Sequence, residues 1–163
     1  MMVVLKLVCL LLVVSTVIPS VAHVLELPGK MRLSREQYLA VQPIYYPGFT
    51  VIGAAEPLSI IALAVLLALS PRATSTFWLI AGATLASMLT HLLYWVLTAP
   101  VNRVWIQDER LSGSAQRLFG ARASPNERDW TTLRDRWEQS HLYRAVTSVV
   151  AFVLLSIAFL RSA

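Results

Sequence analysis

Four long apolar runs limit this chain to structures that can cross a lipid bilayer. The runs cover about residues 2–25, 48–70, 76–99 and 141–160, and each is long enough to span roughly 30 Å of hydrocarbon as an α-helix. A span inside the bilayer must satisfy its own backbone hydrogen bonds, so a helix is the expected structure. The sequence therefore predicts an all-α fold, a four-helix transmembrane bundle that forms a single integral membrane domain over residues 1–163.

The composition argues against other classes of protein. Charged residues make up 14% of the chain, whereas a soluble domain carries about 25%, so neither a soluble enzyme nor a disordered chain is expected. The basic residues behind the net charge of +5 are mixed with acids and flank the apolar runs, so we expect no nucleic-acid partner. The single cysteine, Cys9, rules out an intrachain disulfide.

Two polar connections, residues 26–47 and 100–140, lie on the same face of the predicted bundle. In the first connection, Ser34 and Gln37 have the spacing of a capping box for a short helix, which Pro43 would end. The other connection, residues 71–75, is short, so the second and third spans are expected to form an antiparallel hairpin.

The second polar connection contains a strong helix start. Ser124-Pro125-Asn126-Glu127 offers a cap, a proline at the first position and a glutamate at the third. Nothing interrupts a helix from there to Leu160, which would give about 36 residues and roughly 54 Å. We therefore expect a long fourth helix that projects beyond the membrane.

The distribution of Lys and Arg predicts the orientation of the bundle. The face with the long connections carries Lys30, Arg32, Arg35, Arg103, Arg110, Arg117, Arg122, Arg128, Arg134 and Arg136. We expect an integral protein of a bacterial inner membrane, and the positive-inside rule places this face in the cytoplasm with both termini outside. Ser20-Val21-Ala22, however, resembles a signal-peptidase site. Cleavage there would reverse the orientation of the bundle and make His23 the amino-terminal residue. An amino-terminal histidine can chelate copper through its amine and its ring.

Every predicted span brings a carboxylate or an imidazole to the same end of the bundle. These residues are His23 and Glu26 in the first span, Glu56 in the second, His91 in the third, and Glu138 and His141 in the fourth. A charge at the membrane centre costs about 2.5–3.5 kcal/mol on insertion scales, so such groups usually face the bundle interior. The other half of the bundle is almost wholly apolar. The pattern predicts a polar pocket at the loop-rich end.

Two local patterns support an inward-facing cluster. Glu56 follows the small residues 53–55, which allow close helix approach, and precedes Pro57, which removes a backbone donor. On the third span, polar residues recur at a 3-4-3-4 spacing and form one stripe. The stripe consists of Thr84, Ser87, His91, Tyr94 and Thr98.

The same cluster partly matches a metal site. Di-metal bundles combine E-x-x-H pairs with carboxylates from other helices, and here Glu138/His141 is such a pair while His23/Glu26 is its reverse. Together with Glu56 these residues could hold iron, copper, manganese or zinc.

Plainer interpretations stay open for the same residues. Glu138 and His141 could pair with nearby arginines or lipid headgroups. His23 and Glu26 could simply end a span, and His91 could form an interhelical hydrogen bond. The simplest interpretation of several aromatic residues is an interfacial belt. These are Trp78, Trp105, Trp137, Tyr45 and Tyr46.

Several short motifs resemble the anthrone oxygenase-like membrane family, in particular its bacterial members. The segment His23-Val24-Leu25-Glu26-Leu27-Pro28-Gly29-Lys30 is similar to the end of that family's first span. Glu56 fits its second span, and Pro100-Val101-Asn102 fits a P-x-N element. The carboxy-terminal match comprises Trp130, Leu133 to Glu138, Ser140-His141 and Arg144. The resemblance covers nearly the whole chain, although His91 is not part of the motif.

The resemblance implies a four-span protein and, for fungal members, oxidation of a polyketide anthrone to an anthraquinone without an established organic cofactor. A base would remove a proton from the substrate and leave an electron-rich anion that reacts with oxygen. A buried carboxylate or histidine could serve as this base, because burial raises the proton affinity of a carboxylate. We therefore expect a membrane-embedded oxidoreductase that acts on a hydrophobic aromatic or lipid-like small molecule. Glu56 and His141 are the candidate bases, and Arg134 and Arg144 would bind an anionic group. The supporting residues would be His23, Glu26, His91, Asn102, Trp137 and Glu138.

Two other functions fit the residues. The chain could be a non-catalytic small membrane subunit whose His/Glu cluster fixes helix packing or binds a membrane partner, a lipid headgroup or a second copy. It could also be a metal-binding membrane protein. A proton or ion pathway is less expected, because the apolar half of the bundle offers almost no polar relay.

Overall fold

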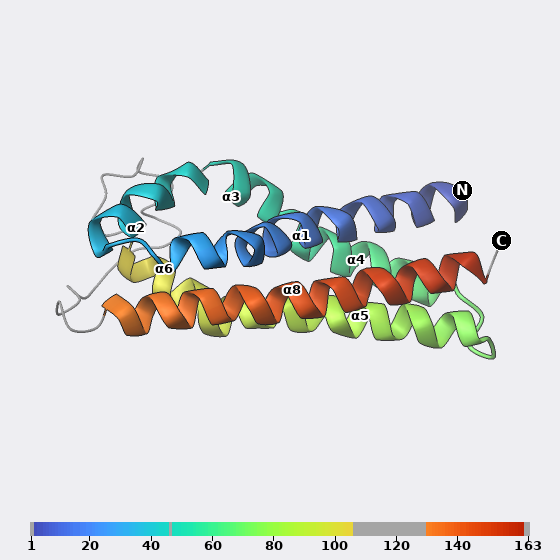
Figure 1. The fold of residues 1–163 in the computed structure, drawn as a ribbon. Helices are drawn as coiled ribbons and strands as arrows, with labels where there is room; N and C mark the ends of the chain where they lie inside the picture. The colour runs from blue at the N-terminus through green and yellow to red at the C-terminus, as the bar shows by residue number, and fades with distance from the viewer. Residues whose placement is uncertain (1, 46, 106–129, 162–163) are drawn as a thin grey trace.

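The chain folds into a bundle of long helices, as predicted. The computed structural model describes residues 2–45, 47–105 and 130–161, and none of these residues forms a strand. Four helical segments are long and apolar enough to cross a membrane: Met2–Lys30, Gly48–Ala68, Ser75–Trp105 and Trp130–Leu160. In Figure 1 both termini lie at one end of the bundle, and the helices of the polar connections gather at the other. The structure confirms the all-α, four-helix transmembrane architecture.

The first helix, α1 (Met2–Lys30), continues past the expected end of the first span at residue 25. His23 and Lys30 are both buried. They lie about two turns apart and therefore on one face of the helix. The helix extends because its last polar residues point into the bundle, where they have partners.

The connection after α1 begins as predicted. Helix α2 (Arg35–Val41) is capped by Ser34, whose Oγ accepts from the Gln37 amide at 3.3 Å. The Gln37 side chain accepts from the Ser34 amide at 3.0 Å, which completes the capping box. The chain then tightens into the 3₁₀ turn η1 (Gln42–Tyr45), which contains Pro43.

The second and third spans each contain one irregular turn. The second span consists of α3 (Gly48–Gly53) and α4 (Ala55–Ala68), which are separated at Ala54. Pro57 causes this break because it has no amide to donate to the Gly53 carbonyl. The third span consists of α5 (Ser75–Leu93), the π-helical turn η2 (Tyr94–Thr98) and α6 (Ala99–Trp105). The short connection between α4 and α5 confirms the predicted hairpin.

Helix α8 (Trp130–Leu160) is the long fourth helix and packs against α1 and α5 (Figure 1). Its 31 described residues correspond to about 46 Å, which exceeds the hydrocarbon thickness of roughly 30 Å. The helix start predicted at Ser124 lies outside the described residues.

The bundle interior is apolar at the end that holds both termini. The buried core there draws on α1, α4, α5 and α8 and contains Cys9, Val13, Leu63, Leu66, Ile80, Ala83, Ala151, Leu155 and Ala158. Small side chains on α5 and α8 allow these helices to approach closely. This core leaves the polar groups of the spans to the opposite end, as the sequence predicts.

Candidate functional site

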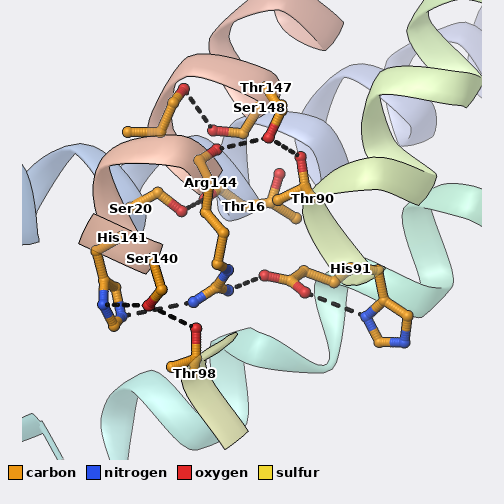
Figure 2. A network of polar contacts seen from close by, with 12 residues as sticks. Thr16, Ser20, Thr90, His91, Thr98, Ser140, His141, Arg144, Thr147 and Ser148 are labelled. Atoms are coloured by element: carbon orange, nitrogen blue, oxygen red, sulfur yellow. Dashed lines mark hydrogen bonds and ion pairs between the residues drawn. The ribbon is translucent and has the colours of Figure 1, made fainter. Parts of the chain in front are cut away.

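Arg144 lies at the centre of a buried polar cluster at the loop-rich end. Its Nη2 donates to Glu56 Oε1, so a buried ion pair joins α8 to α4. Its Nη1 lies 3.5 Å from His141 Nε2, and its guanidinium carbon lies 5.2 Å from the centre of the Tyr94 ring. Figure 2 shows Arg144 between His141 on one side and His91 on the other. Among the described residues, the Arg144 Nε has no hydrogen-bond partner.

His91 holds the second oxygen of Glu56. The Trp95 indole N–H donates to His91 Nε2 at 3.0 Å, so this nitrogen is an acceptor. His91 Nδ1 therefore carries the proton and donates to Glu56 Oε2 at 3.2 Å. Both oxygens of Glu56 thus accept hydrogen bonds, one from a cation and one from a neutral imidazole.

Replacing Trp95 by phenylalanine should shift the tautomer of His91. The lost hydrogen bond is worth about 1 kcal/mol, so the ratio of the Nδ1–H to the Nε2–H form should fall about fivefold. ¹⁵N NMR of labelled histidine measures this ratio, and the chain has only 3 histidines to assign. His23 and His141 serve as internal controls, whose ¹⁵N shifts should not change. An unchanged His91 spectrum would contradict the assignment.

His141 presents an unprotonated nitrogen to the cluster. Its Nδ1 lies 2.8 Å from the backbone carbonyl oxygen of Trp137, which can only accept, so Nδ1 carries the proton. Nε2 is therefore free to accept and faces the Arg144 guanidinium. The imidazole packs against the rings of Trp137 and His23, with centroids 4.0 Å and 4.2 Å away. These contacts fix the ring and its tautomer.

Several hydrogen bonds fasten α8 to the third span, and two of them lie beside His141. The Trp137 indole N–H donates to Asn102 Oδ1 at 2.8 Å. The Ser140 hydroxyl donates to the Trp137 carbonyl at 2.6 Å and lies 2.8 Å from the Thr98 hydroxyl (Figure 2). Trp137 is 4% exposed, so its assignment to an interfacial belt is wrong: Asn102 satisfies its indole N–H inside the bundle. Trp78, by contrast, is exposed.

A second cluster surrounds Lys30, at the end of α1. The Lys30 ammonium is buried and lies 3.2 Å from Glu138 Oε1, 3.5 Å from Glu26 Oε2 and 3.4 Å from His23 Nδ1. It also lies 4.9 Å from the centre of the Trp137 ring, which is a cation–π contact. We call Lys30, Glu26, Glu138, Tyr38 and Tyr45 the Lys30 cluster.

Two tyrosines complete the Lys30 cluster. Tyr38 of α2 donates to Glu138 Oε1 at 2.6 Å, and Tyr45 of η1 donates to Glu26 Oε2 at 2.7 Å. Burial, reinforced by the neighbouring carboxylate, raises the pKa of each phenol above its ordinary value. Both phenols therefore stay protonated and keep donating. The Tyr45 ring also packs against the His23 imidazole, with the ring centroids 4.6 Å apart.

Neither Lys30 nor Tyr38 is a site residue in the sequence analysis. The sequence marks Lys30 as a topology charge and as the end of the family-like segment, although its spacing from His23 and Glu26 could have placed it on their face of the helix. Tyr38 gives no local signal, because it reaches Glu138 through the fold of the connection.

A cavity of about 370 Å³, here called the Arg144 pocket, lies beside Arg144, and Tyr45 of the Lys30 cluster also lines it. All four spans contribute to its wall. Seven of the predicted site residues line it: His23, Glu56, His91, Asn102, Trp137, His141 and Arg144. Glu26 and Glu138 lie behind the wall in the Lys30 cluster.

Arg134 is not brought to the pocket. It pairs with Asp135 at 2.7 Å and packs over the Trp130 ring at 5.0 Å. It lies ten residues before Arg144, about 15 Å along the helix. The prediction that the two arginines bind one anionic group therefore finds no support in the structure.

The carboxylates and imidazoles do not converge as metal ligands. Within the described part of the chain, no three His, Cys, Asp or Glu side chains are placed to hold a metal ion together. The carboxylate of Glu56 faces Arg144, and those of Glu26 and Glu138 face Lys30. The arrangement is one of buried ion pairs, which does not match the di-metal pattern.

Comparison with known proteins gives one match. The family model described as Anthrone oxygenase matches residues 43–154 of the 163-residue chain. The matched region contains Glu56, His91, His141 and Arg144 and leaves out α1. No curated protein and no solved structure matches the chain.

Proposed function

This chain belongs to the anthrone oxygenase family, and from that premise we propose that it is a membrane-embedded oxidoreductase. Its substrate would be a hydrophobic aromatic compound with an acidic hydroxyl group, or the keto tautomer of such a compound, of which an anthrone is one. The reaction would take place in the Arg144 pocket. Family membership supports the reaction class, and the geometry of the pocket supports the roles of its residues.

One observation carries the proposal: an unprotonated imidazole nitrogen lies beside a guanidinium in a cavity of ligand size. His141 Nε2 is unprotonated because Nδ1 donates to the Trp137 carbonyl, and its lone pair faces the Arg144 guanidinium. The Arg144 Nη1 is 3.5 Å away, so an oxygen atom bound there would meet a base and a positive charge at once. Ligand pockets commonly measure about 300–1,000 Å³, and this one measures about 370 Å³.

The chemistry proceeds in three steps that balance with dioxygen as the oxidant. His141 takes the proton of the substrate hydroxyl at Nε2, and Arg144 stabilises the oxyanion. The anion's electron density reaches a ring carbon that bears hydrogen; this carbon bonds to dioxygen, and the distal oxygen receives the proton from His141. The carbon then loses its hydrogen as a proton while the O–O bond breaks. The products are a new carbonyl group and water.

Glu56 acts in this proposal by holding Arg144 in place. Both of its oxygens are already occupied, by Arg144 and by His91. Of the two candidate bases, the geometry therefore favours His141. The Lys30 cluster has a different part: it supports helix packing at the end of the pocket, because its two carboxylates are bonded to Lys30 and to tyrosines.

Replacing His141 by glutamine tests the proposal. Purified protein in lipid nanodiscs is supplied with anthrone, and both oxygen uptake and anthraquinone formation are followed. We expect wild-type protein to form one anthraquinone per dioxygen and the variant to lose about 100- to 10,000-fold in kcat. Gln139→Ala, at an exposed position on the same helix, should retain wild-type kcat.

Two results would contradict the proposal. The first is a wild-type protein that oxidises neither anthrone nor other hydroxyaromatic compounds. The second is His141→Gln protein with wild-type kcat. A non-catalytic subunit would show the first result, and its His141→Gln variant would change only in thermal stability.

A further inference from the structure

The exposed residues of the Arg144 pocket lie on one side of the bundle. Ala54 and Pro57 of the second span and Trp95 of η2 line the pocket and are exposed. The opposite wall contains His141 and Arg144, on α8, and both are buried. The pocket therefore reaches the surface between α3–α4 and η2.

The surface around this opening is apolar on both sides. Val51, Leu58 and Ile61 flank it on the second span, and Leu92 and Val96 flank it on the third. Each of these five side chains is more than half exposed. Large apolar side chains on the outside of membrane-spanning helices face the lipid acyl chains. The opening consequently faces hydrocarbon rather than water.

Both irregular turns of the spans border the opening. The break at Ala54 and the π-helical turn at Tyr94–Thr98 each contribute residues to the pocket wall. Single π-helical turns inside α-helices are frequent at functional sites. Straight helices at these two positions would present regular side-chain ridges to each other, whereas the break and the wide turn leave a gap.

We infer that the Arg144 pocket is loaded from within the bilayer, through the gap between α3–α4 and η2. This inference rests on the proposed function and adds that the substrate is a membrane-dissolved ring compound. Such a compound concentrates in hydrocarbon because the removal of its apolar surface from water is favourable. Entry through the gap spares it a passage through water and leads it directly to Arg144 and His141.

Gly53 offers a way to close the gap without disturbing the fold. It lines the pocket, and a Cβ at this position would meet no atom within 4 Å. Gly48, on the same short helix, is equally unobstructed but does not line the pocket. Phenylalanine at position 53 therefore blocks the gap, and phenylalanine at position 48 is the matched control.

The first measurement compares these two variants in nanodiscs that contain anthrone. We expect Gly53→Phe to lower kcat/KM about tenfold, mainly through KM, and Gly48→Phe to stay within about twofold of wild type. Equal kcat/KM values for the two variants would overturn the inference that substrate enters from the bilayer. The proposed function would survive that result, because turnover itself would have been observed.

The second measurement needs no turnover and uses the fluorescence of Trp95, isolated as the difference between wild type and Trp95→Phe. Dibrominated lipid should quench this emission more strongly than aqueous iodide, and 9,10-anthraquinone dissolved in the bilayer should quench it as well. Gly53→Phe should reduce the anthraquinone quenching, and Gly48→Phe should not. Stronger quenching by iodide, or anthraquinone quenching that is unaffected by Gly53→Phe, would overturn the inference even if the protein oxidised no anthrone.

Discussion

Glu56→Gln protein should turn over substrate about 100- to 1,000-fold more slowly than wild type, which is the loss expected when one group that stabilises an oxyanion is displaced. Glutamine keeps the volume of Glu56 but removes the charge that holds the Arg144 guanidinium. The neutral amide would hold Arg144 less firmly, so the guanidinium would be less well positioned beside His141 Nε2. The loss should appear in kcat, measured with anthrone in nanodiscs.

The same substitution should leave the protein folded. A fully unpaired buried charge costs about 3–5 kcal/mol, but the glutamine amide oxygen still accepts from Arg144, so the loss of stability should be smaller. Glu56→Asp keeps the charge and should recover part of the activity. Asp135→Asn removes an exposed carboxylate on α8 that pairs with Arg134 and should retain wild-type kcat. Unchanged turnover in Glu56→Gln would remove Glu56 from the proposed machinery.

Lys30→Met should destabilise the bundle by about 3–5 kcal/mol, because removing one partner of a buried ion pair leaves the other charge uncompensated. Glu138 is 5% exposed and would bear most of this penalty, whereas Glu26 is 40% exposed and can be hydrated. The unfolding free energy is measured by denaturant titration in detergent micelles. Arg32→Met removes an exposed cation just after α1 and should have little effect.

A second variant separates the loss of charge from the loss of packing. Adding Glu138→Gln to Lys30→Met removes the stranded carboxylate and should recover part of the lost stability. If the double variant is as unstable as the sum of the two single variants, the two residues do not interact energetically. That result would refute the ion-pair account of the Lys30 cluster.

Much of the fold could be predicted from hydropathy and local signals. The apolar runs were sufficient to predict the number of membrane spans. Ser34 and Gln37 indicated the start of α2, and Pro57 indicated an irregular backbone near Glu56. The end of α1 could not be predicted in this way. Hydropathy falls at Glu26, which would end the helix there. The helix continues because the buried Lys30 is paired with the carboxylates of Glu26 and Glu138 and packs against aromatic rings.

The location of the candidate site was predictable, but which side chains contact each other was less so. The depth of His23, Glu56, His91 and His141 in the spans indicates that they gather at one end, and the structure brings them to one cavity. Their partners depend on rotation about each helix axis, which the sequence does not reveal. Arg144 is thus the partner of Glu56, and Tyr38 reaches Glu138 from 100 positions away.

The phenol–carboxylate bonds of Tyr38 and Tyr45 give the first connection a part in the architecture beyond joining two spans. Tyr45, at the end of that connection, also forms part of the cavity wall. The shape of the chamber is thus determined partly by residues that need not satisfy the demands of membrane insertion. A substitution at Tyr45 would therefore change part of the chamber wall without changing a residue embedded in lipid.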